Sequence, residues 1–281
     1  MDPCHPSGQN YLYDTVGRLT EAWVGSQHLT YSYAANTCGV AAAGKNGDRT
    51  ATSVNGVATT YCYDAADRLT SSSDTAIGSP TYDAHGNTVT LGAQTLTYDG
   101  ADRHVKTVVA GGATVSYRRD SSGRIVERTE GANAAVHYGF AGPGDGPAFV
   151  LSTTNVVTQR MIGLLGGASV TKQSSGDVWS YPNAHGDVIA TANGAGAKQG
   201  TTLSYDPFGV GTAPDNAQGN YDFGWLGQAQ RGAEHATGIA TIEMGRPPVR
   251  AGAGPVPRGR SRGGRVGERL RLHGRGSDQR D

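Results

Sequence analysis

The sequence predicts an all-β protein made of a repetitive ribbon of β-hairpins. Three observations carry this prediction: a Tyr-Asp phrase recurs at short intervals, strand-like segments alternate polar with apolar residues, and 43 glycines accompany few Leu, Met or Phe residues. Little material therefore remains for amphipathic helices. Because a single hairpin unit is too small to bury its own apolar face, neighbouring units must stack against one another.

The Tyr-Asp phrase is written four times with nearly one design, over residues 13–20, 63–70, 82–89 and 98–105, and a weaker fifth copy covers 117–126. An aromatic residue is followed by Asp, a small or polar pair, then Gly, Asp or Asn, then in most copies Arg, and then an aliphatic or β-branched residue. This order predicts a strand, a tight turn and a returning strand.

Each position of the phrase has a physical role in that turn. The Asp carboxylate is placed to accept hydrogen bonds from turn amides, and the Gly or Asp three residues later tolerates a positive φ. The Arg that follows can reach an adjacent carboxylate or carbonyl. The repeat residues that we single out are Tyr13, Asp14, Gly17, Arg18, Tyr63, Asp64, Arg68, Tyr82, Asp83, Gly86, Tyr98, Asp99 and Arg103, with Asp67 and Asp102 at the positive-φ position of their copies.

Residues 95–98 and 113–117 alternate polar with apolar or aromatic side chains, which is typical of a strand with one buried face and one wet face. From about residue 139 to 180 the phrase lapses into turns rich in Gly and Pro. Four further phrases then follow in order, and their residues are His185, Gly186 and Asp187, then Tyr205, Asp206, Pro207 and Gly209, then Gly227 and Gln228, then Thr237 and Gly238.

The ordered succession of these phrases resembles the Rhs/YD-repeat proteins and their repeat-associated core, over about residues 11–245. The resemblance implies YD repeats over 1–138 and a truncated repeat-associated core over 139–245. It also implies a β-ribbon that spirals into a hollow shell and encloses a polymorphic toxin domain that follows the core. We therefore expect this chain to be a fragment of such a shell.

In a full-length parent, the resemblance implies two partners, its own C-terminal toxin cargo and a secretion apparatus. It also implies a secreted or cell-surface location in a bacterium, although no signal peptide is visible in this sequence. One alternative is a surface adhesion or carbohydrate-binding module. A weaker one is an enzyme within residues 139–200.

The last segment, residues 246–281, breaks the pattern. It carries ten arginines and three acids with no strand period, and we expect it to be disordered. Shifting the reading frame by one nucleotide permits the Gly-Arg-Phe and Asp-Pro phrases that the family resemblance leads us to expect there. We therefore hypothesise a frameshift near Gly245, which sequencing of the encoding DNA would test.

The whole chain has a formal net charge of zero, but residues 1–245 hold 14 basic and 21 acidic side chains. This mildly acidic balance argues against a specific nucleic-acid surface there, and the tail lacks the aromatic residues that stack on bases. No stretch approaches the about 20 apolar residues that a membrane-spanning helix needs.

Candidate chemistry is scarce. Residues 39–45 fit the start of a phosphate-binding loop, but Asn46 replaces the Ser or Thr that would hold magnesium, and a turn is expected next. His185 and Asp187 lack an accompanying nucleophile elbow. The recurring aspartates lie one to a turn, unlike calcium ligands, and the histidines are scattered. We expect no enzyme activity, no catalytic residue, no cofactor and no metal. For Cys4, Cys38 and Cys62, pairing and free thiols both stay open.

Overall fold

The computed structural model describes residues 10–211, 221–236, 239, 241–243, 249–250 and 254–255. Within these ranges the regular structure is almost entirely β, which confirms the predicted fold class. The one α-helix, α1 (Ala43–Asn46), is a single turn, and two 3-10 turns cover Leu165–Gly167 and Gly227–Ala229.

The first sheet holds six strands in the order of the sequence, and each strand pairs with its neighbour in an antiparallel manner. The strands are β1 (Asn10–Tyr13), β2 (Leu19–Val24), β3 (Gln27–Ser32), β4 (Ala51–Val54), β5 (Val57–Tyr63) and β6 (Leu69–Ser72).

The second sheet holds thirteen strands, again in sequence order and antiparallel. They are β7 (Thr81–Tyr82), β8 (Thr88–Leu91), β9 (Gln94–Tyr98), β10 (His104–Val109), β11 (Thr114–Arg119), β12 (Ile125–Glu130), β13 (Val136–Gly139), β14 (Phe149–Leu151), β15 (Val157–Gly163), β16 (Ser169–Gln173), β17 (Val178–Pro182), β18 (Val188–Asn193) and β19 (Lys198–Gln199). The boundary expected between residues 138 and 139 falls inside β13, so the sheet continues across it.

A third, small sheet joins β20 (Tyr221–Asp222), β21 (Ala233–Glu234), β22 (Thr241–Ile242), β23 (Val249–Arg250) and β24 (Gly254–Pro255). The strands β23 and β24 lie inside the segment that we expected to be disordered, so four of its residues are paired. The rest of residues 246–281 lies outside the described residues.

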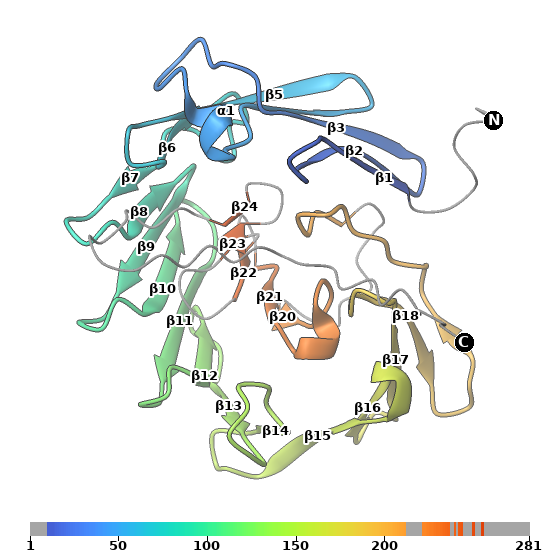
Figure 1. Cartoon of the computed structure of the whole chain (residues 1–281). Coiled ribbons are helices and arrows are strands. Elements are labelled where there is room, and N and C mark those ends of the chain that lie inside the picture. Colours follow the sequence, from blue (N-terminus) through green and yellow to red (C-terminus); the bar gives the residue numbers. More distant parts are fainter. Residues whose placement is uncertain are drawn as a thin grey trace, which may run out of the picture.

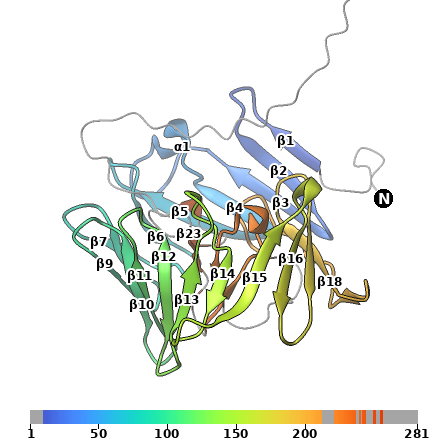
Figure 2. The same ribbon diagram turned by 90° about the horizontal axis from the view of Figure 1, so that it is seen from below.

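The two large sheets form one wall that curls around a central space, and β20 to β22 lie within the curl (Figure 1). Seen from below, the strands from β7 to β18 stand side by side along the wall (Figure 2). A buried cluster joins the two sheets, because Tyr61, Tyr63 and Leu69 of the first sheet pack with Leu91 and Leu96 of the second.

The Tyr-Asp phrase forms the same hairpin turn at each copy. In the second copy, one carboxylate oxygen of Asp64 accepts the amides of Ala66 (2.8 Å) and Arg68 (3.0 Å), and the other accepts Arg68 Nε at 2.7 Å. The backbone closes with a hydrogen bond from the amide of Asp64 to the carbonyl of Arg68. Three further copies repeat this geometry, with Asp14 and Arg18, Asp99 and Arg103, and Asp120 and Arg124.

The residue three positions after the Asp of the phrase has a positive φ in every copy, as the sequence predicted. Gly17 and Gly86 have φ of 80° and 83°, while Asp67 and Asp102 have φ of 59° and 57°. In the third copy, Asn87 replaces the Arg and donates its amide to Asp83 at 2.9 Å. The pairing register shifts beside these turns, as expected for a type I turn that ends in a bulge.

The arginines also link each turn to the next unit of the wall. Arg18 donates to the carbonyl of Gly44 at 2.6 Å, and Arg103 donates to the carbonyl of Asp120 at 2.5 Å. In an antiparallel meander every second turn lies at the same rim, so all the Tyr-Asp turns share one rim of the wall. The phrase therefore forms a chain of contacts along that rim, in which Asn46, His85 and Asn87 bridge to Asp67 and Asp102.

Candidate functional site

The interior of the curl contains two buried glutamates from the C-terminal strands. Glu234 ends β21 and is 1% exposed, while Glu243 follows β22 and is 5% exposed. A buried carboxylate is strongly unfavourable unless charged or polar partners surround it. The inner face of the wall supplies these partners.

Glu234 is held by two side chains of the wall. Arg128 of β12 binds it with both arms of the guanidinium, at 2.7 Å from Nη2 to Oε1 and 2.8 Å from Nε to Oε2. Tyr117 of β11 donates its hydroxyl to Oε2 at 2.9 Å. Burial and the charges of the two glutamates raise the pKa of Tyr117 well above its ordinary value, so this hydroxyl stays a donor.

Glu243 has two other partners on the wall. Arg119 Nη2 lies 2.6 Å from Oε2, and His104 Nδ1 lies 3.0 Å from Oε1. The other ring nitrogen of His104 lies 2.8 Å from the Thr107 hydroxyl. Burial by itself would raise the pKa of Glu243, but the charges and hydrogen bonds of His104 and Arg119 outweigh it and hold the pKa below its usual value.

Apolar contacts surround the two glutamates and their partners. Val109, Val115 and Tyr117 of the wall pack with Ala236 and Ile239 of the C-terminal segment. Residues 221–243, as far as they are described, are thus docked on the inner wall by a small apolar core and by two ion pairs. We call this segment the docked segment.

None of the five ionisable residues in the ion pairs and hydrogen bonds of the two glutamates, His104, Arg119, Arg128, Glu234 and Glu243, was singled out from the sequence. The pairs join positions 106 to 139 residues apart, and no local spacing reports such contacts. One signal was present: Tyr117 and Arg119 point to the same face of β11, and Arg128 lies opposite Tyr117 on β12. A cation on a face that carries buried aromatics indicates a buried partner.

The phrases of the expected core come together beside the docked segment. Asp187 accepts the amide of Leu226 at 3.0 Å, and the amide of Gln228 donates to the carbonyl of Gly186 at 2.9 Å. At Gly209, which has a φ of 87°, an added Cβ would lie only 2.9 Å from the Trp225 ring. Gly227 similarly lies against Val188.

Tyr205 lies against Gly224, and its neighbour Asp206 accepts the amides of Phe208 and Val210, both at 2.8 Å. Pro207 lies within the same turn. Burial raises the pKa of Asp206. Thr237 and Gly238, the last predicted phrase, lie outside the described residues.

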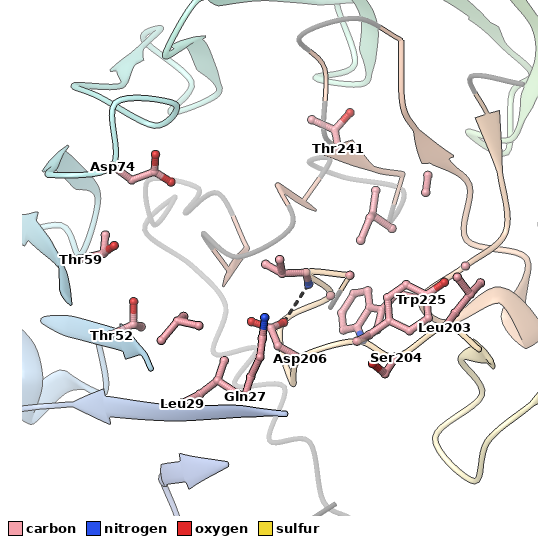
Figure 3. Close-up of a pocket in the computed structure, with 18 of the residues that line it drawn as sticks. Gln27, Leu29, Thr52, Thr59, Asp74, Leu203, Ser204, Asp206, Trp225 and Thr241 are labelled. Carbon is pink, nitrogen blue, oxygen red and sulfur yellow. Dashed lines mark hydrogen bonds between the residues drawn. The ribbon is translucent and has the colours of Figure 1, made fainter. Parts of the chain in front are cut away.

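Between the first sheet and the docked segment lies a cavity of about 560 Å³. Leu29, Thr52 and Thr59 project from the first sheet, and Trp225 and Thr241 approach from the C-terminal part of the chain (Figure 3). The hydroxyls of Tyr31 and Thr241 are buried without a hydrogen-bond partner among the described atoms. The cavity is thus lined by both aromatic and polar groups.

The repeat residues hold the wall together and do not converge on this cavity. The carboxylates of Asp14, Asp64, Asp83 and Asp99 accept hydrogen bonds within their own turns, and those of Asp67 and Asp102 bind residues of neighbouring turns. The tyrosines differ in burial: Tyr63 is 8% exposed and donates to the carbonyl of Arg49, Tyr82 donates to the carbonyl of Leu69 at 2.8 Å, and Tyr13 is 50% exposed. Tyr98 packs at a tilt against His104, with ring centroids 5.8 Å apart.

The described histidines are all paired with carboxylates, within 3.2 Å. The hydrogen bond to Asp187 raises the pKa of His185. The Asp187 carboxylate also accepts hydrogen bonds from the Asn183 side chain and from the amide of Leu226. In the part of the chain that the structure describes, no cluster of three or more metal-binding side chains occurs. The pairs are His28 with Glu21, His85 with Asp102, His104 with Glu243, His137 with Glu127, His185 with Asp187 and His235 with Asp222.

The stretch that fits the start of a phosphate-binding loop folds onto β5. Gly39 bridges to Tyr63, Val40 donates to the carbonyl of Tyr63 at 2.8 Å, and Cys38 forms a disulfide with Cys62. The helix α1 that follows is one turn long and offers no extended N-terminus to a phosphate. Among the described residues, no helix is both long and apolar enough to span a membrane.

No family model matches the chain, and no curated protein matches it. Among solved structures it is similar to the crystal structure of TcdB2-TccC3-TEV (18% identity, TM-score 0.48, 84% of this chain and 13% of that one) and to that of TcdB2-TccC3-Cdc42 (16%, 0.47, 88% and 15%). A Photorhabdus luminescens Tc holotoxin pore with a mutated TccC3 also matches (14%, 0.42, 88% and 16%). The chain thus spans about one seventh of the length of these chains.

Proposed function

We propose that this chain is a section of a hollow β-shell of the Rhs, YD-repeat type, whose wall holds the polypeptide that follows it in a longer parent protein. One observation carries the proposal. The wall curls around its own C-terminal strands and binds them on its inner face through two buried glutamates.

The ion pairs support a holding role because they fix one register of the docked segment. A shift of this segment by a single residue would leave Arg119 and Arg128 buried without their carboxylates, at a cost of several kcal/mol. Apolar packing alone would tolerate such a shift more readily. The wall is thus suited to retain one specific stretch of chain in its interior.

On this proposal, the chain itself performs no catalysis. In the parent, the held polypeptide would be a C-terminal toxin, and a secretion apparatus would export the assembly from a bacterium to the medium or the cell surface. These partners and this location come from the resemblance of the sequence phrases.

Limited proteolysis of the full chain tests the proposal. A short site for a sequence-specific protease is inserted directly after Glu243 or, as a control, in the turn at Leu165–Gly167, where Leu165 is 98% exposed. We expect slow cleavage after Glu243 and fast cleavage in the turn under native conditions, and equal rates in denaturant. Adding Glu234→Gln and Glu243→Gln should speed the cleavage after Glu243.

Equal native rates at the two sites would contradict the proposal, because the chain after Glu243 would then be as accessible as an exposed turn. Specific binding of the chain to members of a glycan array would instead favour a surface module that binds carbohydrate.

A further inference from the structure

The two ends of the curled wall face each other across a seam, and within the described part of the chain one loop crosses it. The loop over residues 203–211 follows β19 and crosses toward β3 (Figure 1). Its Phe208 joins the hydrophobic cluster of Ala22, Val24, Leu29 and Tyr31, which belongs to the other end of the wall. Phe208 therefore bridges the seam.

Two side chains of the other end of the wall contact the Phe208 ring. The Tyr31 ring meets it edge to face, with centroids 5.1 Å apart, and the Arg49 guanidinium lies 3.6 Å from its centroid. Arg49 is only 9% exposed, so this cation and aromatic contact is largely shielded from water. The next residue, Gly209, lies against Trp225, which ties the bridging loop to the docked segment.

The position of Arg49 depends on the loop that joins β3 to β4. This loop folds back on β5, where the Cys38 to Cys62 disulfide spans 24 residues with a Cα to Cα distance of 5.4 Å. The Asn36 side chain donates to the carbonyl of Tyr61, and the Tyr63 hydroxyl donates to the carbonyl of Arg49 at 3.0 Å. The disulfide thus lies within the set of contacts that holds Arg49 over Phe208.

The same residues border the cavity. Tyr31 of β3 and Arg49 of the loop before β4 line it on one side, and Asp206, Gly209 and Trp225 line it from the opposite side. A movement of the loop between β3 and β4 would therefore loosen the grip on Phe208 and open the cavity at the seam.

We propose that the Cys38 to Cys62 disulfide keeps the seam closed over the cavity, and that its reduction by a dithiol releases Phe208 and opens the seam. This inference rests on the proposed function, since the disulfide would control access to the interior in which the wall holds the docked segment. The dithiol supplies two electrons and two protons. The bond between the two sulfurs breaks, two thiols form, and the dithiol closes into its own cyclic disulfide.

The quenching of Trp225 fluorescence by acrylamide tests this proposal in the full chain. Trp23→Phe and Trp179→Phe leave Trp225 as the one tryptophan, and Cys4→Ser removes the third cysteine. We expect the quenching constant to rise about twofold or more when dithiothreitol reduces the disulfide, because local opening exposes the ring. Phe208→Ala should raise quenching in the oxidised protein to the same level.

The double variant Cys38→Ser/Cys62→Ser is the matched control. It should be quenched like the reduced protein, with no further response to dithiothreitol. Equal quenching of the oxidised and reduced forms of the single-tryptophan protein that keeps Cys38 and Cys62 overturns the proposal. Mass spectrometry that finds these two cysteines unlinked after oxidation also overturns it.

The protease site after Glu243 separates this inference from the proposed function. Fast native cleavage there overturns the proposed function, whatever the quenching shows. Slow cleavage in both redox states, together with unchanged quenching, overturns only the redox-controlled seam.

Discussion

Replacing Glu234 with Gln should be among the most damaging isosteric changes in this chain. The side chain keeps its shape but loses the negative charge that lies 2.7 and 2.8 Å from the Arg128 nitrogens. One of its two acceptor oxygens is replaced by an NH₂ group, which would face an N–H donor of Arg128. Arg128 is only 7% exposed and has few alternatives beyond Glu130. Breaking a buried pair from one side costs about 3–5 kcal/mol.

This cost corresponds to a change of about 100-fold to 5,000-fold in the folding equilibrium of the docked segment, at about 1.4 kcal/mol for each factor of ten. Hydrogen exchange of the β21 and β22 amides measures that equilibrium directly, and urea unfolding followed by circular dichroism measures the whole wall. Because the wall strands pair independently of Glu234, exchange should accelerate more in β21 than in β4.

The control is Glu21→Gln, which removes a carboxylate that is 36% exposed and pairs with His28. An exposed pair contributes at most about 1 kcal/mol. The double variant Arg128→Met/Glu234→Gln removes both charges and should recover part of the loss. If Glu234→Gln destabilises the chain no more than Glu21→Gln does, the ion pair is not what holds the docked segment.

Three further predictions concern other contacts of the chain. Gly209→Ala should lower the free energy of unfolding by more than the about 1–2 kcal/mol that a left-handed backbone costs a residue with a side chain, because the new Cβ would lie 2.9–3.0 Å from Trp225 and Ile242. Gly196→Ala is the matched control, because Gly196 has a φ of 79° and open space around it. Equal changes in the urea midpoint of the two variants would contradict the packing argument. Asp64→Ala should lower the free energy of unfolding by about 1–2 kcal/mol, since it removes two amide contacts and one guanidinium contact, while Asp64→Asn keeps one carbonyl acceptor and should lose less. Equal losses would contradict this expectation, because the acceptor oxygen that Asn keeps would then contribute nothing without the charge. The contributions of His185 and Glu243 to thermal stability should both be complete between about pH 4.5 and 6.5. The raised pKa of His185 gives a contribution that is complete below pH 6.5 and is lost as the pH rises through the folded pKa, and the lowered pKa of Glu243 gives one that is complete above pH 4.5 and is lost as the pH falls through the folded pKa. His185→Gln should remove part of the decline above pH 6.5, and an unchanged profile would contradict that assignment.

The hairpin turns were predictable from the sequence because their contacts are local. Asp64 binds residues two and four positions away, and the positive φ of Gly17 and Asp67 follows from the turn itself. The alternation of residues 113–117 likewise predicted a strand, since the two faces of β11 meet different surroundings. Local chemistry fixed these elements before any tertiary contact was known.

The interior was not predictable in the same way. Glu234 and Arg128 meet only because the wall between them curls, and the degree of curl follows from the summed twist of many strands. The pairing of Cys38 with Cys62 depends on the loop between β3 and β4 folding back on β5. Sequence spacing alone left these cysteines undecided, because a separation of 24 residues fits a disulfide and two free thiols equally well.

The two kinds of contact also differ in what they do for stability. Along the rim, Arg103 binds Asp99 of its own turn and the carbonyl of Asp120 in the next turn, so each unit is stabilised by its neighbours and the loss of one link stays local. The docked segment instead binds β10, β11 and β12 at once, and Phe208 joins opposite ends of the wall. The contacts of the docked segment and of Phe208 therefore couple the unfolding of hairpin units that the contacts along the rim leave nearly independent. For this reason, changes at Glu234 or Phe208 should lower the cooperativity of unfolding, whereas a change in one turn should lower the stability of that hairpin alone.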